Sequence, residues 1–232
     1  MDLCEYLLHW KEQHPSSDSD SFHVTEIRED QHGKSLLILN GAIYCSLYNK
    51  EFHRLHICEG DLLSVGFLGE MSEKLLIPRA REYALYLLDG KDYTEKQLKR
   101  KLIDHHYSDE ISRKVLDDLK QMNLVDDRRY AQTYLEQKSG KRSFRDMKEK
   151  LSLRGIDPAV TTEVWYEMRE DPDEENDPEK AALESCFEKK AKALNFDNPK
   201  DRDRMVRYLL GKGFEYSAIR KVMREKTLSD TN

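Results

Sequence analysis

The sequence predicts a mainly α fold: tandem three-helix repeats that form an elongated, curved body, preceded by a small β-rich N-terminal extension. Two observations predict it. Charged residues make up 36% and hydrophobic residues 38% of the 232 residues, a composition that favours helices with wide solvated faces over a thick sheet core. From Pro78 almost to the end, apolar residues recur at intervals of three and four, the period of a helix with one buried face. Stacked small helical units produce such a body.

The first 77 residues are predicted to form the β-rich extension. After an amphipathic start, the polar stretch 14–21 is interpreted as a linker. Three short segments rich in branched or aromatic residues are the predicted strands: 22–27, 36–39 and 42–47. Asn40 and Gly41 separate the last two strands and indicate a tight hairpin, because a type I′ turn needs positive φ at both central positions. A helix over 48–57 and an apolar run over 62–68 complete the extension, which is small enough that we expect it to pack on the first helical repeat.

One apolar spacing occurs three times after residue 77. Five residues stand at offsets of 0, 4, 9, 13 and 17 in each copy: Leu98, Leu102, Tyr107, Ile111 and Val115; Met147, Leu151, Ile156, Val160 and Val164; Met205, Leu209, Phe214, Ala218 and Val222. All helix pairs share the helical period, but the matched loop length and the capping residues Ser108 and Asp157 favour a true repeat. Tyr130 and Tyr134 are expected in the core as well. We predict three repeats over 78–127, 128–170 and 180–226, an acidic linker over 171–179, where two prolines forbid a continuous helix, and a tail over 227–232.

Charge is sorted into blocks along the chain. The formal net charge of -6 argues against simple wrapping of nucleic acid, because each phosphate contact needs a cation. However, the stretch from Arg128 to Arg154 holds nine basic and three acidic residues, and the stretch from Asp157 to Glu188 holds two and twelve. Lys200 to Lys226 again holds nine basic and four acidic residues. Such blocks can steer a partner that carries both signs, although solvated helices also drift in charge by chance.

Cysteine usage and hydropathy predict a cytoplasmic protein. The four cysteines are scattered without CxxC spacing, and the N-terminus lacks the apolar core of a signal peptide. No apolar run approaches the roughly 20 residues that a membrane-spanning helix needs. A reducing, aqueous compartment fits both observations.

The residue patterns predict neither catalysis nor a bound cofactor. We find no nucleophile elbow, Walker loop, glycine-rich dinucleotide loop or HExxH motif. Carboxylates lie in solvated stretches where nothing raises their pKa. His53, His56, Cys58 and Cys45 lie near one another in sequence, but the HxxHxC pattern lacks the spacing of a tetrahedral zinc site. We therefore expect no enzyme, no metal and no cofactor, and interpret these residues as a helical histidine pair beside a buried cysteine.

Several stretches resemble the signatures of the RecX family. They are LVDDRRYA from Leu124, GKRSF from Gly140, LSLRGI from Leu151, YLLGKGF from Tyr208 and IRKV from Ile219. They occur in order within residues 78–226. The resemblance implies tandem three-helix repeats in a monomeric, cytoplasmic bacterial protein. It also implies binding in the groove or at the end of RecA filaments on single-stranded DNA, with inhibition of the recombinase and co-protease activities of RecA. Because the chain is acidic, any direct DNA binding is expected to be weak.

By this resemblance, the charged surfaces of the repeats contact the partner. The predicted partner-binding residues are nine: Lys141, Arg142, Arg145, Lys148 and Arg154 of the second repeat, and Arg207, Lys212, Arg220 and Arg224 of the third. Cations in a loop and at a helix start suit acidic protein groups or phosphate. Surface Lys and Arg are also common on helices that only need to stay soluble, so the prediction concerns the patch more than any single member.

Two other functions are compatible with the sequence. A helix-turn-helix-like DNA-binding regulator is the main alternative, since stacked three-helix units resemble such modules. A recognition helix would start with Arg, Asn or Gln, whereas the corresponding helices here start at Asp109, Asp157 and Glu215. The second alternative is a scaffold of helical repeats that binds an unrelated partner and has no effect on RecA.

Overall fold

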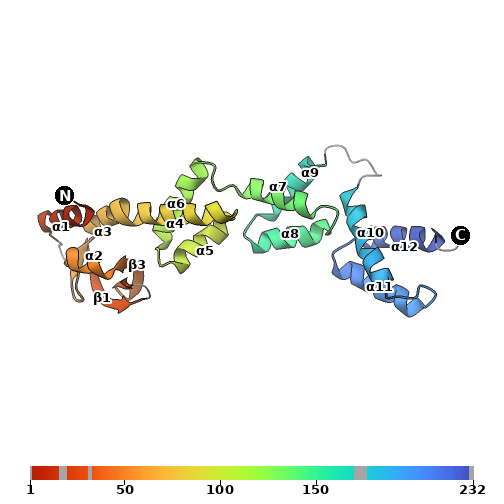
Figure 1. Ribbon diagram of the computed structural model, residues 1–232, viewed down its shortest axis with the longest axis horizontal. Helices are drawn as coiled ribbons and strands as arrows, with labels where there is room; N and C mark the ends of the chain where they lie inside the picture. The colour runs from red at the N-terminus through yellow and green to blue at the C-terminus, as the bar shows by residue number, and fades with distance from the viewer. Residues whose placement is uncertain (1, 16–19, 31–32, 170–176, 230–232) are drawn as a thin grey trace. The chain divides into compact units, whose positions relative to one another are not determined.

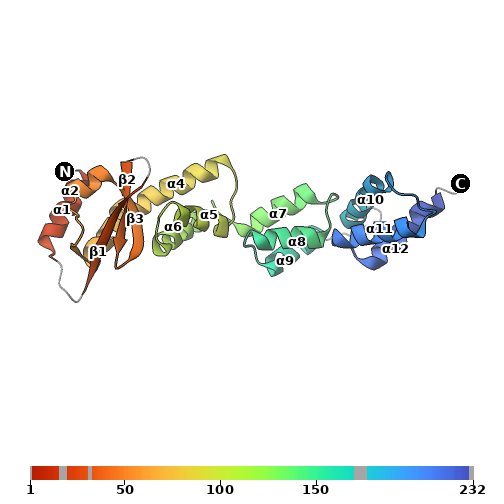
Figure 2. The same cartoon turned by 90° about the horizontal axis from the view of Figure 1, so that it is seen from below.

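The computed structural model describes residues 2–15, 20–30, 33–169 and 177–229. These residues fall into two compact units, Met1–Val125 and Asp126–Asn232 (Figures 1 and 2). We call them the first and the second unit. Part of the predicted polar linker, residues 16–19, and most of the predicted acidic linker, residues 171–176, lie outside the described residues.

A small antiparallel sheet opens the first unit. The sheet is formed by β1 (Ser21–Glu29), β2 (Lys34–Leu39), β3 (Ala42–Tyr48) and β4 (Leu62–Ser64). Helix α1 (Leu3–Gln13) precedes β1, and helix α2 (Asn49–Arg54) follows β3. The strand order is β3-β2-β1-β4. Asn40 and Gly41 join β2 to β3 with φ of 49° and 81°, which confirms the predicted hairpin. The predicted apolar run over 62–68 is divided: its first residues pair with β1 as a fourth strand, and the rest begins a helix.

A continuous helical stretch leads from the sheet into the repeats. It comprises α3 (Val65–Met71), the π-helical segment η3 (Ser72–Leu76) and α4 (Ile77–Gly90). The sequence pattern placed the start of a helix at Pro78, and the regular α-helix α4 does begin at Ile77 with Pro78 in its first turn. What the pattern did not predict is that η3 leads into α4 without a break, so Pro78 lies inside the longer helical stretch. A proline removes one backbone donor and crowds the preceding turn of a regular α-helix. Here the N–H of Ile77 bonds to Ser72 O, so the regular ladder is already interrupted just before the proline.

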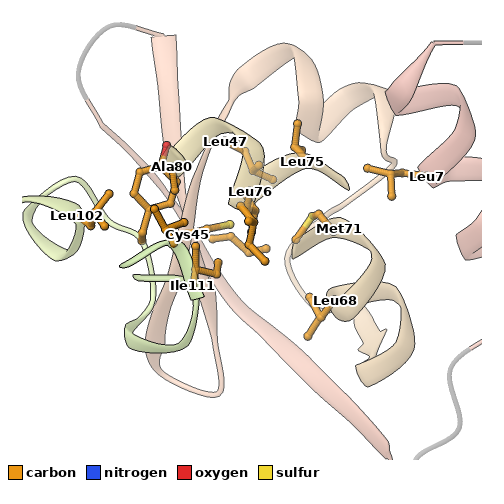
Figure 3. Close-up of a cluster of buried hydrophobic side chains, with 14 of the residues drawn as sticks. Leu7, Cys45, Leu47, Leu68, Met71, Leu75, Leu76, Ala80, Leu102 and Ile111 are labelled. Atoms are coloured by element: carbon orange, nitrogen blue, oxygen red, sulfur yellow. The ribbon is translucent and has the colours of Figure 1, made fainter. Parts of the chain in front are cut away.

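One hydrophobic core holds the first unit together. Figure 3 shows Leu7 of α1, Cys45 of β3, Met71 of α3, Leu102 of α5 (Glu95–Asp104) and Ile111 of α6 (Asp109–Gln121) within one cluster of buried side chains. The extension and the first repeat therefore share a core, which confirms the predicted packing of one on the other. A sheet of this size buries too little apolar surface to be stable alone.

The described residues of the second unit, 126–169 and 177–229, form six helices. They are α7 (Asp127–Lys138), α8 (Phe144–Leu153), α9 (Pro158–Glu167), α10 (Pro178–Ala191), α11 (Pro199–Gly211) and α12 (Tyr216–Ser229). Two hydrophobic clusters lie here, one among α7–α9 and one among α10–α12. The helix α10 begins within the predicted linker, where the carboxylate of Asp177 caps Glu179 N–H.

The threefold spacing found in the sequence marks the cores of the repeats. Of its fifteen residues, thirteen are buried, and Val160 and Ala218 are half-buried against the clusters of their own repeats. Tyr134 is buried and Tyr130 packs on the same cluster. Since equivalent positions are buried in all three copies, the repeat is confirmed as a structural unit.

The middle helix of each repeat ends in the same hydrogen-bonded motif. Tyr107, Ile156 and Phe214 donate their N–H groups to the carbonyls of Leu102, Leu151 and Leu209, five residues back. Each preceding residue has positive φ: His106 at 67°, Gly155 at 99° and Gly213 at 88°. This is the Schellman arrangement, which satisfies the last carbonyls of a helix and turns the chain toward the next one. The matched loop length in the sequence therefore reflects a matched turn.

Candidate partner-binding surface

Ser143 fixes the start of α8, where most of the predicted cations lie. Its side chain is almost fully buried, and its Oγ accepts the N–H of Asp146 at 3.2 Å as the N-cap of the helix. The same hydroxyl donates to Lys212 O at 2.6 Å. A serine hydroxyl has one donor and two acceptor sites, so both roles are filled at once. The second contact satisfies a carbonyl at the C-terminal end of α11, which the helix leaves without an internal partner.

Gly213 completes this contact between the second and third repeats. A Cβ built on Gly213 would lie 2.8 Å from Ser143 Oγ and 3.2 Å from Arg145 Cβ. The start of α8 and the turn after α11 are therefore in direct contact inside the second unit. We call this contact and the cations beside it the repeat joint, which comprises residues 141–145, Lys212 and Gly213. It brings Lys141, Arg142 and Arg145 into the neighbourhood of Lys212, which is far away in sequence.

The cations at the repeat joint are exposed, and only part of their charge is matched. Lys141, Arg142, Arg145 and Lys212 are all exposed. Arg142 pairs with Asp146 at 2.8 Å, and Lys150 pairs with the same carboxylate at 3.0 Å. Partial burial opposes ionisation of Asp146, but the hydrogen bonds from Arg142 and Lys150 outweigh it and hold the pKa of Asp146 below its ordinary value. One carboxylate thus serves two cations, which leaves excess positive charge at this surface.

Four of the predicted residues lie over aromatic rings: Lys148 and Arg154 in the second repeat, and Lys212 and Arg220 in the third. The guanidinium of Arg154 lies 4.6 Å from the ring centroid of Tyr134 and 5.8 Å from that of Tyr130, and it donates to Tyr130 Oη at 3.1 Å. Lys148 Nζ lies 5.8 Å from the ring of Phe144. Cation–π contacts of this kind stabilise the repeat. The structure thus places Arg154 at the far end of α8 from the repeat joint.

The remaining predicted residues lie on α11 and α12. Arg207 is exposed and donates to Asp203 O at 3.3 Å within its own helix. Arg220 and Arg224 line a shallow depression on α12 together with Lys221. The structure therefore distributes the nine cations over four places. They are the repeat joint with Lys148 beside it, the α12 face, the C-terminal end of α8 with Arg154, and Arg207 on α11.

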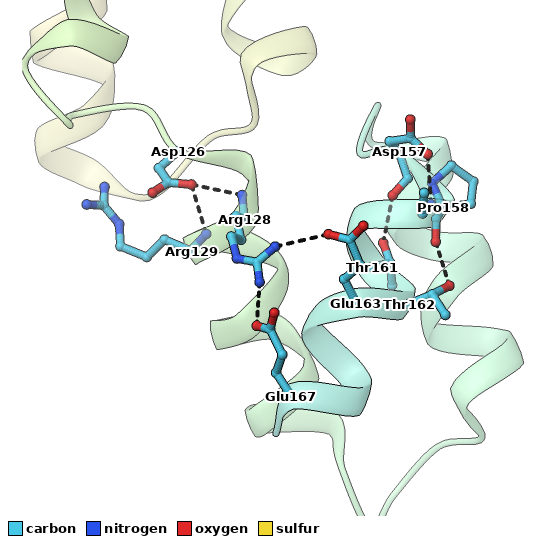
Figure 4. Close-up of polar contacts among 10 residues, drawn as sticks. Asp126, Arg128, Arg129, Asp157, Pro158, Thr161, Thr162, Glu163 and Glu167 are labelled. Atoms are coloured by element: carbon cyan, nitrogen blue, oxygen red, sulfur yellow. Dashed lines mark hydrogen bonds and ion pairs between the residues drawn. The ribbon is translucent and has the colours of Figure 1, made fainter. Parts of the chain in front are cut away.

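The acidic block of the sequence is partly used inside the second unit. Arg128 binds the carboxylates of Glu163 and Glu167, which ties α7 to α9 (Figure 4). The half-buried Glu179 of α10 accepts Phe144 N–H at 3.3 Å. Burial raises the pKa of Glu179, so the expectation that nothing raises the pKa of the carboxylates was wrong for this residue. These carboxylates bind cations and donors of neighbouring helices, so the acidic count of the sequence overstates the negative charge available to a partner.

Sequence reasoning missed Ser143 and Gly213, although both lie within the GKRSF and YLLGKGF stretches. The signals were present: a serine before a helix is a common N-cap, and a glycine after a helix is a common C-terminal cap. The sequence alone does not show that these two residues are in contact.

Among the helices in the part of the chain that the structure describes, none has the length and hydropathy of a membrane-spanning helix. His, Cys, Asp and Glu side chains in that part of the chain nowhere gather in a group of three suited to a metal ion.

Comparison with known proteins identifies the family. The chain matches the domain families described as RecX, first three-helix domain, over residues 80–119, and RecX, third three-helix domain, over residues 177–223. It is 30% identical over 158 residues to the regulatory protein RecX of Clostridium botulinum (strain Alaska E43 / Type E3), covering 67% of this chain and 72% of that protein. The identity to the regulatory protein RecX of Clostridium acetobutylicum is 25% over 178 residues, which covers 76% of this chain and 83% of that one.

Solved structures agree in fold. The crystal structure of a regulatory protein RecX matches with a TM-score of 0.55 at 16% identity, over 86% of this chain and 99% of that one. The crystal structure of RecX from Lactobacillus salivarius matches with a TM-score of 0.54 at 20% identity, over 66% of this chain and 97% of that one. Family matches at both ends of the repeat region, similar relatives and a shared fold lead to one conclusion: the chain belongs to the RecX family of regulatory proteins.

Proposed function

We propose that this RecX-family protein is a negative modulator of RecA that acts by binding and not by catalysis. It binds RecA filaments on single-stranded DNA, in their groove or at their end, and so inhibits the recombinase and co-protease activities of RecA. The observation that carries the proposal is the repeat joint, where cations of the second and third repeats lie on one exposed surface. This surface has the positive charge that is needed to bind an acidic protein face or a phosphate backbone. Membership of a family of regulatory proteins also supports the proposal.

The distribution of charge favours the filament over naked DNA as the partner. The recognition-type helices begin with acidic groups: Asp109 is at the start of α6, and Asp157 caps α9. Carboxylates at a groove-facing helix start would repel phosphate, and base-reading side chains are missing there. A filament of protein and single-stranded DNA offers both protein carboxylates and phosphates to the joint cations. We therefore expect the protein to bind RecA-coated DNA more tightly than bare DNA.

Charge reversal at the repeat joint tests this proposal. We expect Arg142→Glu with Arg145→Glu to weaken binding to RecA on fluorescently labelled single-stranded DNA by about tenfold or more, since a tenfold loss needs only about 1.4 kcal/mol. The matched control is Lys96→Glu with Arg100→Glu, which makes the same charge change on two exposed residues of α5, the corresponding helix of the first repeat.

Three results would count against the proposal. If the joint variant and the α5 control bind equally well, the repeat joint is not the contact surface. If wild-type protein binds bare DNA as tightly as RecA-coated DNA, the DNA-binding alternative gains support. If neither form of DNA is bound at any salt concentration, the protein acts on another partner. Repeating the titration at several salt concentrations separates phosphate contacts, which weaken steeply with salt, from protein contacts.

A further inference from the structure

A groove in the first unit has no role in the proposed function. It has a volume of about 450 Å³ and lies between β3, α3 and the start of α6. Ile43 of β3 and Val65 of α3 line it and are 47% and 52% exposed, and Phe22 of β1 beside them is 39% exposed. Large apolar side chains that stay in water around a hollow mark an interaction site more often than chance exposure does.

Gly69 keeps the groove open at a cost to its own helix. It lies in α3 and lines the groove, and a Cβ built on it would meet no atom within 4 Å. A glycine inside a helix is less favourable than alanine by about 1 kcal/mol, so packing gives no reason for this residue. Gly66, one turn earlier, differs: its Cβ would lie 2.9 Å from Trp10. Close packing accounts for Gly66, whereas the missing side chain of Gly69 serves only the open space above it.

The rim of the groove carries an unmatched negative charge. Lys114 of α6 pairs with Glu73 of η3. Glu110, one turn before Lys114, is exposed and has no ion pair with any residue that the structure describes. Lys114 pairs with Glu73 and not with Glu110, so the net negative charge at this rim is complementary to a Lys or Arg of a partner. Apolar walls and an acidic rim together describe a partner segment with apolar and basic faces.

The geometry favours a helix over a strand as that segment. Strand β3 is at the edge of the sheet, but its pairing with β2 shifts register at Tyr44, so its hydrogen-bonding edge is irregular there. The hydroxyl of Tyr44 donates to Leu68 O at 3.2 Å and is 2.6 Å from Ser72 Oγ, which ties the strand to the helical wall. A bulged edge that is joined to a helix is a poor template for an added strand.

We propose that this groove binds a short amphipathic helix of a partner protein. Two or three large apolar side chains of that helix enter the space over Gly69 and contact Ile43 and Val65. A flanking Lys or Arg of the same helix pairs with Glu110. This is the helix-in-groove mode of recognition, in which anchors at i, i+3 or i+4, and i+7 enter one hollow. It uses none of the cations of the second unit and stands independently of the proposed function.

Synthetic helical peptides test the proposal on the full chain by fluorescence anisotropy. The probe is a labelled peptide of about 15 residues, long enough to form helix, with leucines at i, i+3 and i+7 and lysines beside them. Two comparison peptides carry glutamates in place of the lysines, or the same residues in scrambled order. We expect the lysine peptide to bind at least about tenfold more tightly than either comparison peptide. Glu110→Lys is expected to reverse the preference between the lysine and glutamate peptides.

Gly69→Leu closes the groove without touching the core, because its side chain enters open space. We expect it to weaken binding of the lysine peptide by about tenfold. Gly90→Leu is the matched control: it adds the same side chain at another helical glycine of the first unit with no atom within 4 Å, and binding should stay unchanged. Equal binding by wild type and Gly69→Leu would overturn the proposal, and so would equal binding of the patterned and scrambled peptides. Self-association of the wild type that Gly69→Leu abolishes, seen by sedimentation, would assign the groove to a second copy and overturn the choice of partner.

Discussion

Replacing Gly213 by alanine tests the repeat joint through stability alone. Gly213 has a φ of 88°, and an L-residue in the left-handed region costs about 1–2 kcal/mol. The added Cβ also lies 2.8 Å from Ser143 Oγ and 3.2 Å from Arg145 Cβ. Ser143 cannot move aside without weakening its two hydrogen bonds, and overpacking of this kind costs about 1–3 kcal/mol. The two effects together predict a loss of about 2–5 kcal/mol in the free energy of unfolding.

Gly140→Ala is the matched control for this prediction. Gly140 also has positive φ, 69°, and belongs to the same unit, but a Cβ there meets no atom within 4 Å. Its substitution carries only the backbone cost of about 1–2 kcal/mol. Urea unfolding of the full chain, followed by circular dichroism, gives both free energies. We expect Gly213→Ala to lose about 1–3 kcal/mol more than Gly140→Ala. Equal losses would show that the start of α8 and the turn after α11 do not touch in solution.

Three more predictions concern the repeats and their caps. His106→Gly should stabilise the protein by about 1 kcal/mol in urea unfolding, because glycine relieves the left-handed backbone at φ 67°; a loss would mean that contacts of the imidazole outweigh this strain. Fully buried leucines occupy equivalent positions in the three repeats, and each of the substitutions Leu102→Ala, Leu151→Ala and Leu209→Ala should lower the free energy of unfolding by about 2–5 kcal/mol. A loss well under about 1 kcal/mol at any one of them would contradict the equivalence of the three repeats. Glu179→Gln keeps the acceptor for the backbone N–H that Glu179 binds and removes a half-buried charge. Burial raises the pKa of Glu179 in the folded state, so the ionised carboxylate lowers the stability of the wild type as pH rises above about 4.3, the pKa of an unperturbed glutamate. The variant should therefore be more stable than wild type at neutral pH, and the difference should vanish toward acidic pH. A difference in stability that does not depend on pH would contradict this prediction.

The sequence predicted the repeats because their signal is local and repeated. Fifteen apolar positions with one spacing are hard to reconcile with any arrangement except equivalent cores, and the turn between the middle and last helices has the same length in each copy. The hairpin at Asn40 and Gly41 was predicted for the same reason, since a two-residue turn depends on its own backbone angles. Structural features that depend on residues close in sequence could therefore be predicted from the sequence.

Features that depend on distant contacts were not predictable from the sequence. Strand β4 is only three residues long and forms because it pairs with the start of β1. The helix that runs through Pro78 is retained because its residues pack in the core on both sides of the proline, and tertiary packing outweighs a local breaker. The joint cations illustrate the same limit at the site: the sequence indicated which residues are basic, whereas the contact between Ser143 and Lys212 shows which of them lie together.

Negative modulation of RecA can be measured as a change in RecA ATP hydrolysis on single-stranded DNA. Increasing amounts of the wild-type protein are added to preformed filaments, and the hydrolysis rate is followed at several salt concentrations. We expect a dose-dependent fall in the rate at amounts of protein too small to coat the DNA itself. A rate that stays constant while the protein demonstrably remains folded would contradict the proposed modulation of RecA.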